Sequence, residues 1–306
     1  MSKKKIALIV GGNSQDGRYL SSFLLKKNYC IHVIFNKNKQ KIDKRIKIIK
    51  FNINDRTKFE IYCKKLSNLE IYYFPSINVD STKNENKKIF EKNIDLNFVK
   101  LNQLLEIVSK LHNKKKIKIF YSCSSHIFKG NKAKGKKSEK SDYITNSYYG
   151  FSKLCGLRLC EFYRNKYNLF ISVGILFPHF SKFSNSNFLI PKIYNQLKKN
   201  QVINIHNVNS KIDFLHTKQV IKLIYKVMKL KKPNTFIISS GKKVEIRRIC
   251  EILGKLMSKK VKIKSTIKKK ERLNDLAGNI NKIKKFINIS KNELSITKNL
   301  SDFINE

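Results

Sequence analysis

The sequence lacks the features that mark secreted, disulfide-bonded or membrane-spanning proteins. Its six cysteines are scattered and none forms a CxxC pair, so it predicts neither a disulfide framework nor a zinc or other metal site. No apolar run approaches the roughly 20 residues that a membrane span needs. The basic segment at residues 2–5 leads straight into an apolar run, without a cleavable apolar segment between them. We therefore expect a cytoplasmic protein with reduced cysteines.

Acidic residues are few, with 21 Asp and Glu against 66 Lys and Arg, which gives a formal charge of +45. Almost all of the positive charge is lysine, and it is spread along the whole chain beside many Asn and Ile residues. A dedicated nucleic-acid binder usually gathers arginines and aromatic residues on one element. We therefore attribute the charge to a compositional bias and expect no specific nucleic-acid partner, although anionic ligands should be attracted at low salt.

Short apolar runs alternate with helical patterns, which predicts an α/β fold with a doubly wound parallel sheet. The alternation weakens beyond Pro178. We therefore expect a nucleotide-binding Rossmann domain at residues 1–180 and a smaller C-terminal α/β lobe, mainly for substrate, at residues 181–306. Expected strands lie at 6–10, 31–35, 45–51, 71–74, 117–121, 169–177, 235–239 and 261–263, and expected helices at about 19–25, 96–111, 146–167, 190–197, 217–230 and 244–257.

Two segments show little pattern. Residues 80–91 are rich in lysine and only weakly periodic. Residues 129–142 form a polar stretch of glycine and charge, which predicts a loop that is either disordered or a lid.

A glycine-containing turn follows the first expected strand and precedes a helical pattern. This unit opens a dinucleotide-binding domain, since backbone N–H groups and the helix N-terminus attract a pyrophosphate. The usual three glycines read Gly11, Ser14 and Gly17, so a side chain occupies the middle position and predicts a slightly wider turn or weaker binding. The expected cofactor-binding residues of the turn are Gly11, Asn13, Ser14, Gln15, Asp16 and Gly17.

The end of the second expected strand bears on the choice of cofactor. An acidic residue there suits the ribose 2′-hydroxyl of NAD, and a basic residue suits the 2′-phosphate of NADP. The sequence has Asn36 and Lys37 and no acid, which favours NADP, with NAD as the alternative.

Two local patterns could carry chemistry. Tyr149 and Lys153 lie four residues apart on an expected helix, which places both side chains on one face. A lysine ammonium near a phenol favours the phenolate and lowers its pKa from about 10, giving a usable base. Ser125 ends a run of hydroxyls after the fifth strand, at the sheet edge where ligands bind. A serine-hydrolase alternative, with Ser125 and His126 or His179, lacks the glycine-flanked serine of a nucleophile elbow.

In this order and at these separations, the glycine turn, Ser125, Tyr149 and Lys153 resemble the extended short-chain dehydrogenase/reductase family. Within that family the sequence is most similar to the GDP-mannose 4,6-dehydratase branch. The similar segments cover nearly the whole chain and are residues 7–34 with Gln15-Asp16-Gly17, Phe120-Tyr121, residues 174–177 with His179, Asp213 with His216, and Arg272 before Gly278-Asn279.

The resemblance implies an NAD(P)-dependent enzyme of nucleotide-sugar metabolism that acts on a GDP-hexose for cell-surface polysaccharide biosynthesis, as a homodimer or homotetramer. It implies that Tyr149 moves the proton of the sugar O4, Ser125 hydrogen-bonds O4, and Lys153 holds the cofactor ribose. The other implied residues are His179 for the cofactor, His126 and Arg272 for the substrate and its diphosphate, and Asn97, which serves the substrate site by supporting Lys153.

The largest departure from this branch is Ile127, which stands where the branch has the glutamate that moves protons at C5 and C6. His126 and Glu139 are candidate substitutes. A 4-keto-sugar reductase or an epimerase needs no such acid, and a catalytically impaired nucleotide-binding homologue is a further alternative. Three other positions differ from the branch. This chain has Ile212 where the branch has an arginine, Pro75-Ser76-Ile77 where it has Ala-Ala-Gln, and Asn52 where it has an aspartate. Asn52 remains an expected cofactor contact.

Overall fold

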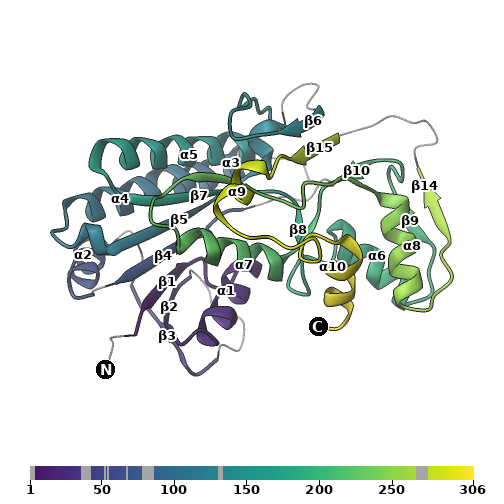
Figure 1. Cartoon of the computed structure of the whole chain (residues 1–306), viewed down its shortest axis with the longest axis horizontal. Helices are drawn as coiled ribbons and strands as arrows, with labels where there is room; N and C mark the ends of the chain where they lie inside the picture. The colour runs from purple at the N-terminus through teal and green to yellow at the C-terminus, as the bar shows by residue number, and fades with distance from the viewer. Residues whose placement is uncertain are drawn as a thin grey trace.

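Seven parallel strands form the central sheet, in the order β12-β7-β5-β4-β1-β2-β3 (Figure 1). The computed structural model describes residues 4–35, 43–51, 53, 55–66, 68–77, 86–129, 134–266 and 275–306. The expected doubly wound parallel sheet is confirmed. Its strands are β1 (Ile6–Val10), β2 (Cys30–Ile34), β3 (Ile46–Ile48), β4 (Leu69–Tyr73), β5 (Ile117–Ser124), β7 (Phe170–Leu176) and β12 (Thr235–Ile238).

Helices cover both faces of the sheet (Figure 1). One face carries α1 (Gln15–Leu25) packed against α7 (Thr217–Met228). The other carries α2 (Arg56–Lys64), α4 (Lys100–Lys110) and α5 (Tyr148–Tyr167), with α3 (Lys87–Ile94) against α5.

The weakly patterned segment ends earlier than expected, because α3 begins at Lys87. Asn86 caps it, with Oδ1 accepting a hydrogen bond of 2.9 Å from Ile89 N. A π-helical turn, η1 (Asp95–Val99), then joins α3 to α4. A local cap therefore starts a helix where the apolar periodicity is too weak to predict one.

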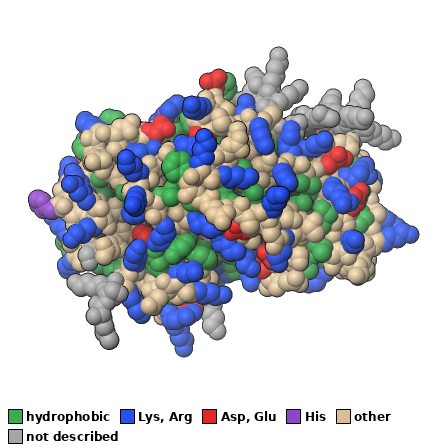
Figure 2. All heavy atoms as spheres, viewed as in Figure 1, with side chains coloured by type: hydrophobic (Ala, Val, Ile, Leu, Met, Phe, Trp, Pro, Cys, Tyr) green, Lys and Arg blue, Asp and Glu red, His purple; other side chains and the backbone are tan. Residues whose placement is uncertain are grey.

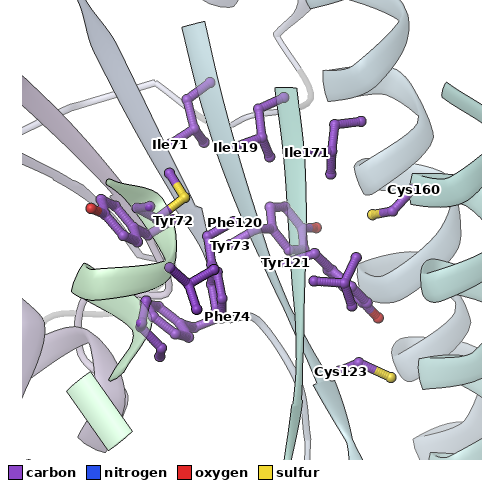
Figure 3. Packing of buried hydrophobic residues seen from close by; sticks show 14 of the residues in the cluster. Ile71, Tyr72, Tyr73, Phe74, Ile119, Phe120, Tyr121, Cys123, Cys160 and Ile171 are labelled. Carbon is purple, nitrogen blue, oxygen red and sulfur yellow. The ribbon is translucent and has the colours of Figure 1, made fainter. Parts of the chain in front are cut away.

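Buried side chains from neighbouring strands pack against one another across the sheet. Ile71, Ile119 and Ile171 are partners in register on β4, β5 and β7 and lie side by side in Figure 3. Tyr72 and Phe120 form the next pair along, and all five residues are fully buried. Such near-continuous apolar strands are typical of a sheet covered on both faces.

A second, smaller hydrophobic core lies beside the sheet domain. The lobe around it holds α6 (Leu189–Lys198), α8 (Ile246–Leu256), α10 (Ile296–Ile304) and the parallel pair β9 (Ile203–Ile205) and β14 (Ile263–Ser265). Residues 181–306 do not belong to this lobe alone, because α7, β12 and α9 (Asn281–Phe286) return to the first core. The chain therefore passes between the two cores several times.

The expectation of a disordered loop or lid at residues 129–142 is wrong for the part that is described. Strand β6 (Lys134–Lys137) pairs in parallel with β15 (Asp275–Gly278). Glu139 follows, and its Oε1 accepts a hydrogen bond of 2.8 Å from Ile237 N. The partner strand is distant in sequence and β6 is mostly lysine, so no local pattern reveals the pairing.

Positive charge is distributed rather than gathered. Figure 2 shows Lys and Arg side chains over the whole of the visible face, with a few acidic side chains between them. Within the described part of the chain, no helix is long and apolar enough to cross a membrane.

Candidate active site

The glycine turn between β1 and α1 is built for close backbone approach. Gly11 has φ +85°, a left-handed conformation that favours glycine. A Cβ atom at Gly17 would lie 2.5 Å from Gly11 O, so a side chain there would open the turn. The N-terminus of α1 faces the same space, which suits an anion.

Ser14 caps the helix that follows this turn. It is the N-cap of α1, with an extended backbone at φ −68°, and its Oγ accepts a hydrogen bond of 3.1 Å from Gly17 N. The serine that replaces the middle glycine therefore satisfies a backbone donor at the start of the helix.

Removal of this cap has a predictable cost. Ser14→Ala should lower the free energy of unfolding by about 1 kcal/mol, and Ser14→Gly by only a few tenths, because glycine is itself tolerated at an N-cap. Urea denaturation measures both values. Equal stability of the alanine and wild-type proteins would contradict the capping role.

Gln15 and Asp16 connect the start of α1 to the segment that follows β7. The Asp16 carboxylate accepts a hydrogen bond of 2.9 Å from His179 Nε2, while His179 Nδ1 donates to Phe177 O at 2.9 Å. Burial acts to lower the pKa of His179, but the Asp16 carboxylate and the Phe177 carbonyl outweigh it and raise that pKa. His179 is therefore favoured as a cation between these two acceptors. The hydroxyls of Ser181 and Ser184 both donate to Gln15 Oε1.

Tyr149 and Lys153 lie on the first turns of α5, as the spacing predicts, and both are buried. Lys153 Nζ donates to Ser122 O at 2.9 Å and lies 5.9 Å from the centroid of the Tyr149 ring. Burial lowers the pKa of Lys153 to about 8. Burial also raises the pKa of Tyr149 to about 12, so the expected lowering of the phenol pKa is wrong for this structure.

Two serines hydrogen-bond the Tyr149 phenol, and a third lines the same cavity. Ser76 and Ser124 hydrogen-bond the phenol, which acts to lower its pKa against the effect of burial. Ser125, at the start of the 3-10 turn η3 (Ser125–Phe128), is 2% exposed and lines the same cavity. Ser76 is a contact that the sequence does not predict, since a lone serine after β4 carries no motif.

These side chains line a cavity of about 250 Å³ at the carboxyl ends of the strands, which we call the reaction cavity. Gln15, Asp16, Ser125, His126, Tyr149, Lys153 and His179 all contribute to it. A neighbouring cavity of about 460 Å³ extends from Tyr149 along Gly11, Asn13 and Ser14. The glycine turn, the helix N-terminus and the lining of this second cavity fit a dinucleotide whose nicotinamide end reaches Tyr149.

Two predicted substrate residues take different positions. His126 lines the reaction cavity with its ring edge-on to Tyr149, at 5.1 Å between centroids. Asn97 is fully buried in η1, where its Oδ1 accepts from Tyr121 and its Nδ2 donates to Ser152 on α5. Asn97 therefore braces the helix that carries Lys153. The predicted residues Asn36, Lys37, Asn52 and Arg272 lie outside the described residues.

Carboxylates are scarce around the reaction cavity. Ile127 is fully buried in the first core and does not line the cavity. Glu139 is engaged with the backbone of β12. Among the described lining residues of this cavity and its cofactor-side neighbour, Asp16 is the one carboxylate, and it is paired with His179.

Comparison with known proteins agrees with this geometry. Residues 8–295 match the family model for GDP-mannose 4,6 dehydratase. The chain is 24% identical over 268 residues to GDP-mannose 4,6 dehydratase 2 of Caenorhabditis elegans, covering 82% of this chain and 70% of the relative. It is 26% identical over 268 residues to human GDP-mannose 4,6 dehydratase, covering 81% and 71%.

Solved structures of nucleotide-sugar enzymes share the fold. A UDP-N-acetylglucosamine 4-epimerase from Methanobrevibacter ruminantium superposes with a TM-score of 0.84 at 17% identity, covering 99% of this chain and 98% of that chain. A dTDP-glucose 4,6-dehydratase from Bacillus anthracis, in complex with NAD, gives 0.81 at 17% identity, with 98% and 96% coverage. The chain thus belongs to the GDP-mannose 4,6 dehydratase family, on an extended short-chain dehydrogenase/reductase fold.

Proposed function

We propose that this protein is an NAD(P)-dependent enzyme that transfers a hydride at C4 of a nucleotide-linked hexose. The observation that carries the proposal is the convergence of Ser125, Tyr149 and Lys153 in one cavity, between the dinucleotide turn and the second lobe. Family membership supports a GDP-hexose as the substrate.

The chain's own residues supply positioning and proton transfer. Tyr149 exchanges a proton with the sugar O4, Ser125 hydrogen-bonds O4, and Lys153 holds the cofactor ribose. Burial of these groups keeps water from the reacting atoms. A bound nicotinamide cofactor supplies or accepts the hydride.

Because carboxylates are scarce around the reaction cavity, the site supports dehydration less well than reduction or epimerisation at C4. Dehydration, the reaction for which the family is named, needs a group that moves protons at C5 and C6, and the branch's glutamate is the buried Ile127 here. Reduction of a 4-keto sugar, or epimerisation at C4, needs only the three residues in the cavity. The loss of the glutamate favours the reductase or epimerase as the second candidate, and a catalytically impaired homologue as the third.

One incubation distinguishes dehydration from reduction, the two outcomes that change the mass of the sugar. The purified protein is mixed with NADP(H) and either GDP-mannose or its 4-keto-6-deoxy product, and the sugar is followed by mass. Loss of water from GDP-mannose supports dehydration and rules out the reductase. A gain of two hydrogens on the keto sugar, with NADPH consumed, supports reduction. Failure to bind any nucleotide would contradict all of the proposed enzymatic functions.

We infer that the cofactor is NADP rather than NAD, because residues 35–39, directly after β2, include Lys37 and no acidic residue. Titration of both cofactors by protein fluorescence tests this inference. Equal or tighter binding of NAD would overturn it. The six unpaired cysteines suit the cytoplasm, where we place the enzyme.

We further infer a homodimer, assembled through α5 and η1. Exposed apolar side chains gather on these neighbouring elements, and contiguous patches of this kind mark interfaces. Phe151→Glu should convert the dimer to a monomer in light scattering, whereas Ile61→Glu, on exposed α2, should not. A monomeric wild-type protein would contradict the inference. The exposed residues are Phe98, Val99, Tyr148, Phe151 and Phe162.

A further inference from the structure

Lys129 faces a third cavity, of about 370 Å³, between the sheet domain and the second lobe. The cavity adjoins the reaction cavity, because Ser125 and Phe214 line both. Lys129 directly follows η3, so it lies where a substrate held at Ser125 would extend toward the second lobe.

The Lys129 ammonium has an uncharged partner. Its Nζ lies 2.9 Å from His126 Nε2, and burial lowers the pKa of His126 to about 3, so the imidazole is neutral and accepts the hydrogen bond. Burial also lowers the pKa of Lys129 to about 8. Among the described residues that line this cavity there is no carboxylate. Lys129 is half-buried, and a half-buried cation without a counter-charge beside it favours the binding of an anion.

The rest of the cavity suits a nucleoside. Ile246 and Leu276 provide apolar walls, and Asn207 and Ser210 provide polar groups. Ile212, which stands where the resembling branch has an arginine, also lines this cavity. The positive charge that an arginine would bring to this cavity is therefore absent at residue 212, whereas Lys129 brings a positive charge to the same cavity.

We propose that Lys129 binds the diphosphate of the nucleotide-sugar substrate, between the sugar at Tyr149 and the nucleoside against the second lobe. This inference rests on the proposed function, because it takes the substrate to be a nucleoside diphosphate sugar. The titratable groups facing Lys129 in the described structure are His126 and His206, and His206 is engaged through Nδ1 with Thr266.

Binding experiments with GDP, UDP and dTDP test the proposal by calorimetry. Lys129→Met should weaken the preferred diphosphate by roughly 10- to 100-fold, and Lys129→Arg should restore most of the affinity. Guanosine, which has no phosphate, should bind wild type and Lys129→Met equally. Lys255→Met, which removes an exposed lysine from α8, is the matched control and should change nothing. Unchanged affinity for NADP in Lys129→Met shows that the variant is folded.

A second readout separates binding from a merely structural role. The diphosphate should raise the pKa of Lys129, so binding just above pH 8 should take up a proton, and affinity should fall as the pH rises further. Calorimetry in two buffers of different ionisation enthalpy measures this uptake, which should vanish in Lys129→Met. Equal diphosphate affinity in wild type and Lys129→Met would overturn the role of Lys129 alone. If wild type binds none of the three diphosphates, the proposed nucleotide-sugar function fails as well.

Discussion

Tyr149→Phe should lower kcat by about 10²- to 10⁴-fold, the range that a positioned acid or base contributes. Ser76 and Ser124 both hydrogen-bond the phenol, and Lys153 lies on the same helix face. Phenylalanine keeps the ring and its contact with His126 but removes the exchangeable proton. Turnover should be measured with the substrate that the mass experiment identifies, together with cofactor affinity, which should change little.

Tyr148→Phe is the matched control, because Tyr148 precedes Tyr149 on α5 but is exposed. It should leave kcat unchanged. Retained turnover in Tyr149→Phe would refute the role of Tyr149 in proton transfer. Loss of cofactor binding in the same variant would show that the phenol mainly positions the cofactor.

Glu70→Ala should lower the free energy of unfolding by about 1–3 kcal/mol, the cost of leaving a buried hydrogen-bond donor without its acceptor. Glu70 lies on β4 and is 4% exposed. Its carboxylate accepts hydrogen bonds from Lys229 at 2.9 Å, Tyr72 at 2.7 Å and Tyr29 at 3.1 Å. The substitution leaves the fully buried Tyr72 hydroxyl without this acceptor and releases Lys229 at the end of α7.

Glu60→Ala provides the comparison for this prediction. Glu60 pairs with Lys64 on α2, and both side chains are well exposed, at 43% and 59%. Its loss should cost less than about 1 kcal/mol. Chemical denaturation of the two variants checks the difference. A cost below 1 kcal/mol for Glu70→Ala would show that the hydrogen bonds of the Glu70 carboxylate do little more than offset the free energy of removing it from water.

The sheet and the central site could be predicted from sequence because their signals are local. Each buried parallel strand is a short apolar run, and the turn after β1 carries its glycines in order. The Tyr149–Lys153 spacing fixes one helix face without knowledge of the fold. The start of α2 has a local signal of the same kind, because Asp55 is its N-cap, with Oδ1 accepting from Lys58 N.

What the sequence could not predict depends on partners that are distant along the chain. The position of Ser76 against Tyr149 is set by the register of β4 in the sheet. Strand β6 requires β15, and the second core is assembled from segments separated by elements of the first. Lys129 cannot be singled out from the sequence, because lysines are abundant along the chain. The structure shows that it lines a cavity whose described residues include no carboxylate. Ser14 departs from the three-glycine pattern, and that pattern carries no information about its role as a helix cap.

The repeated passage of the chain between the two cores also limits how the substrate cleft can open. Two of these crossings, β8 (His179–Phe180) and β11 (Leu215–His216), are hydrogen-bonded to each other as parallel strands. A wide hinge motion would have to bend both together and break the contact of Asp16 with His179. We therefore expect sugar nucleotides to enter through local movement of side chains and loops, with little change in the radius of gyration when ligand-bound and ligand-free samples are compared by X-ray scattering.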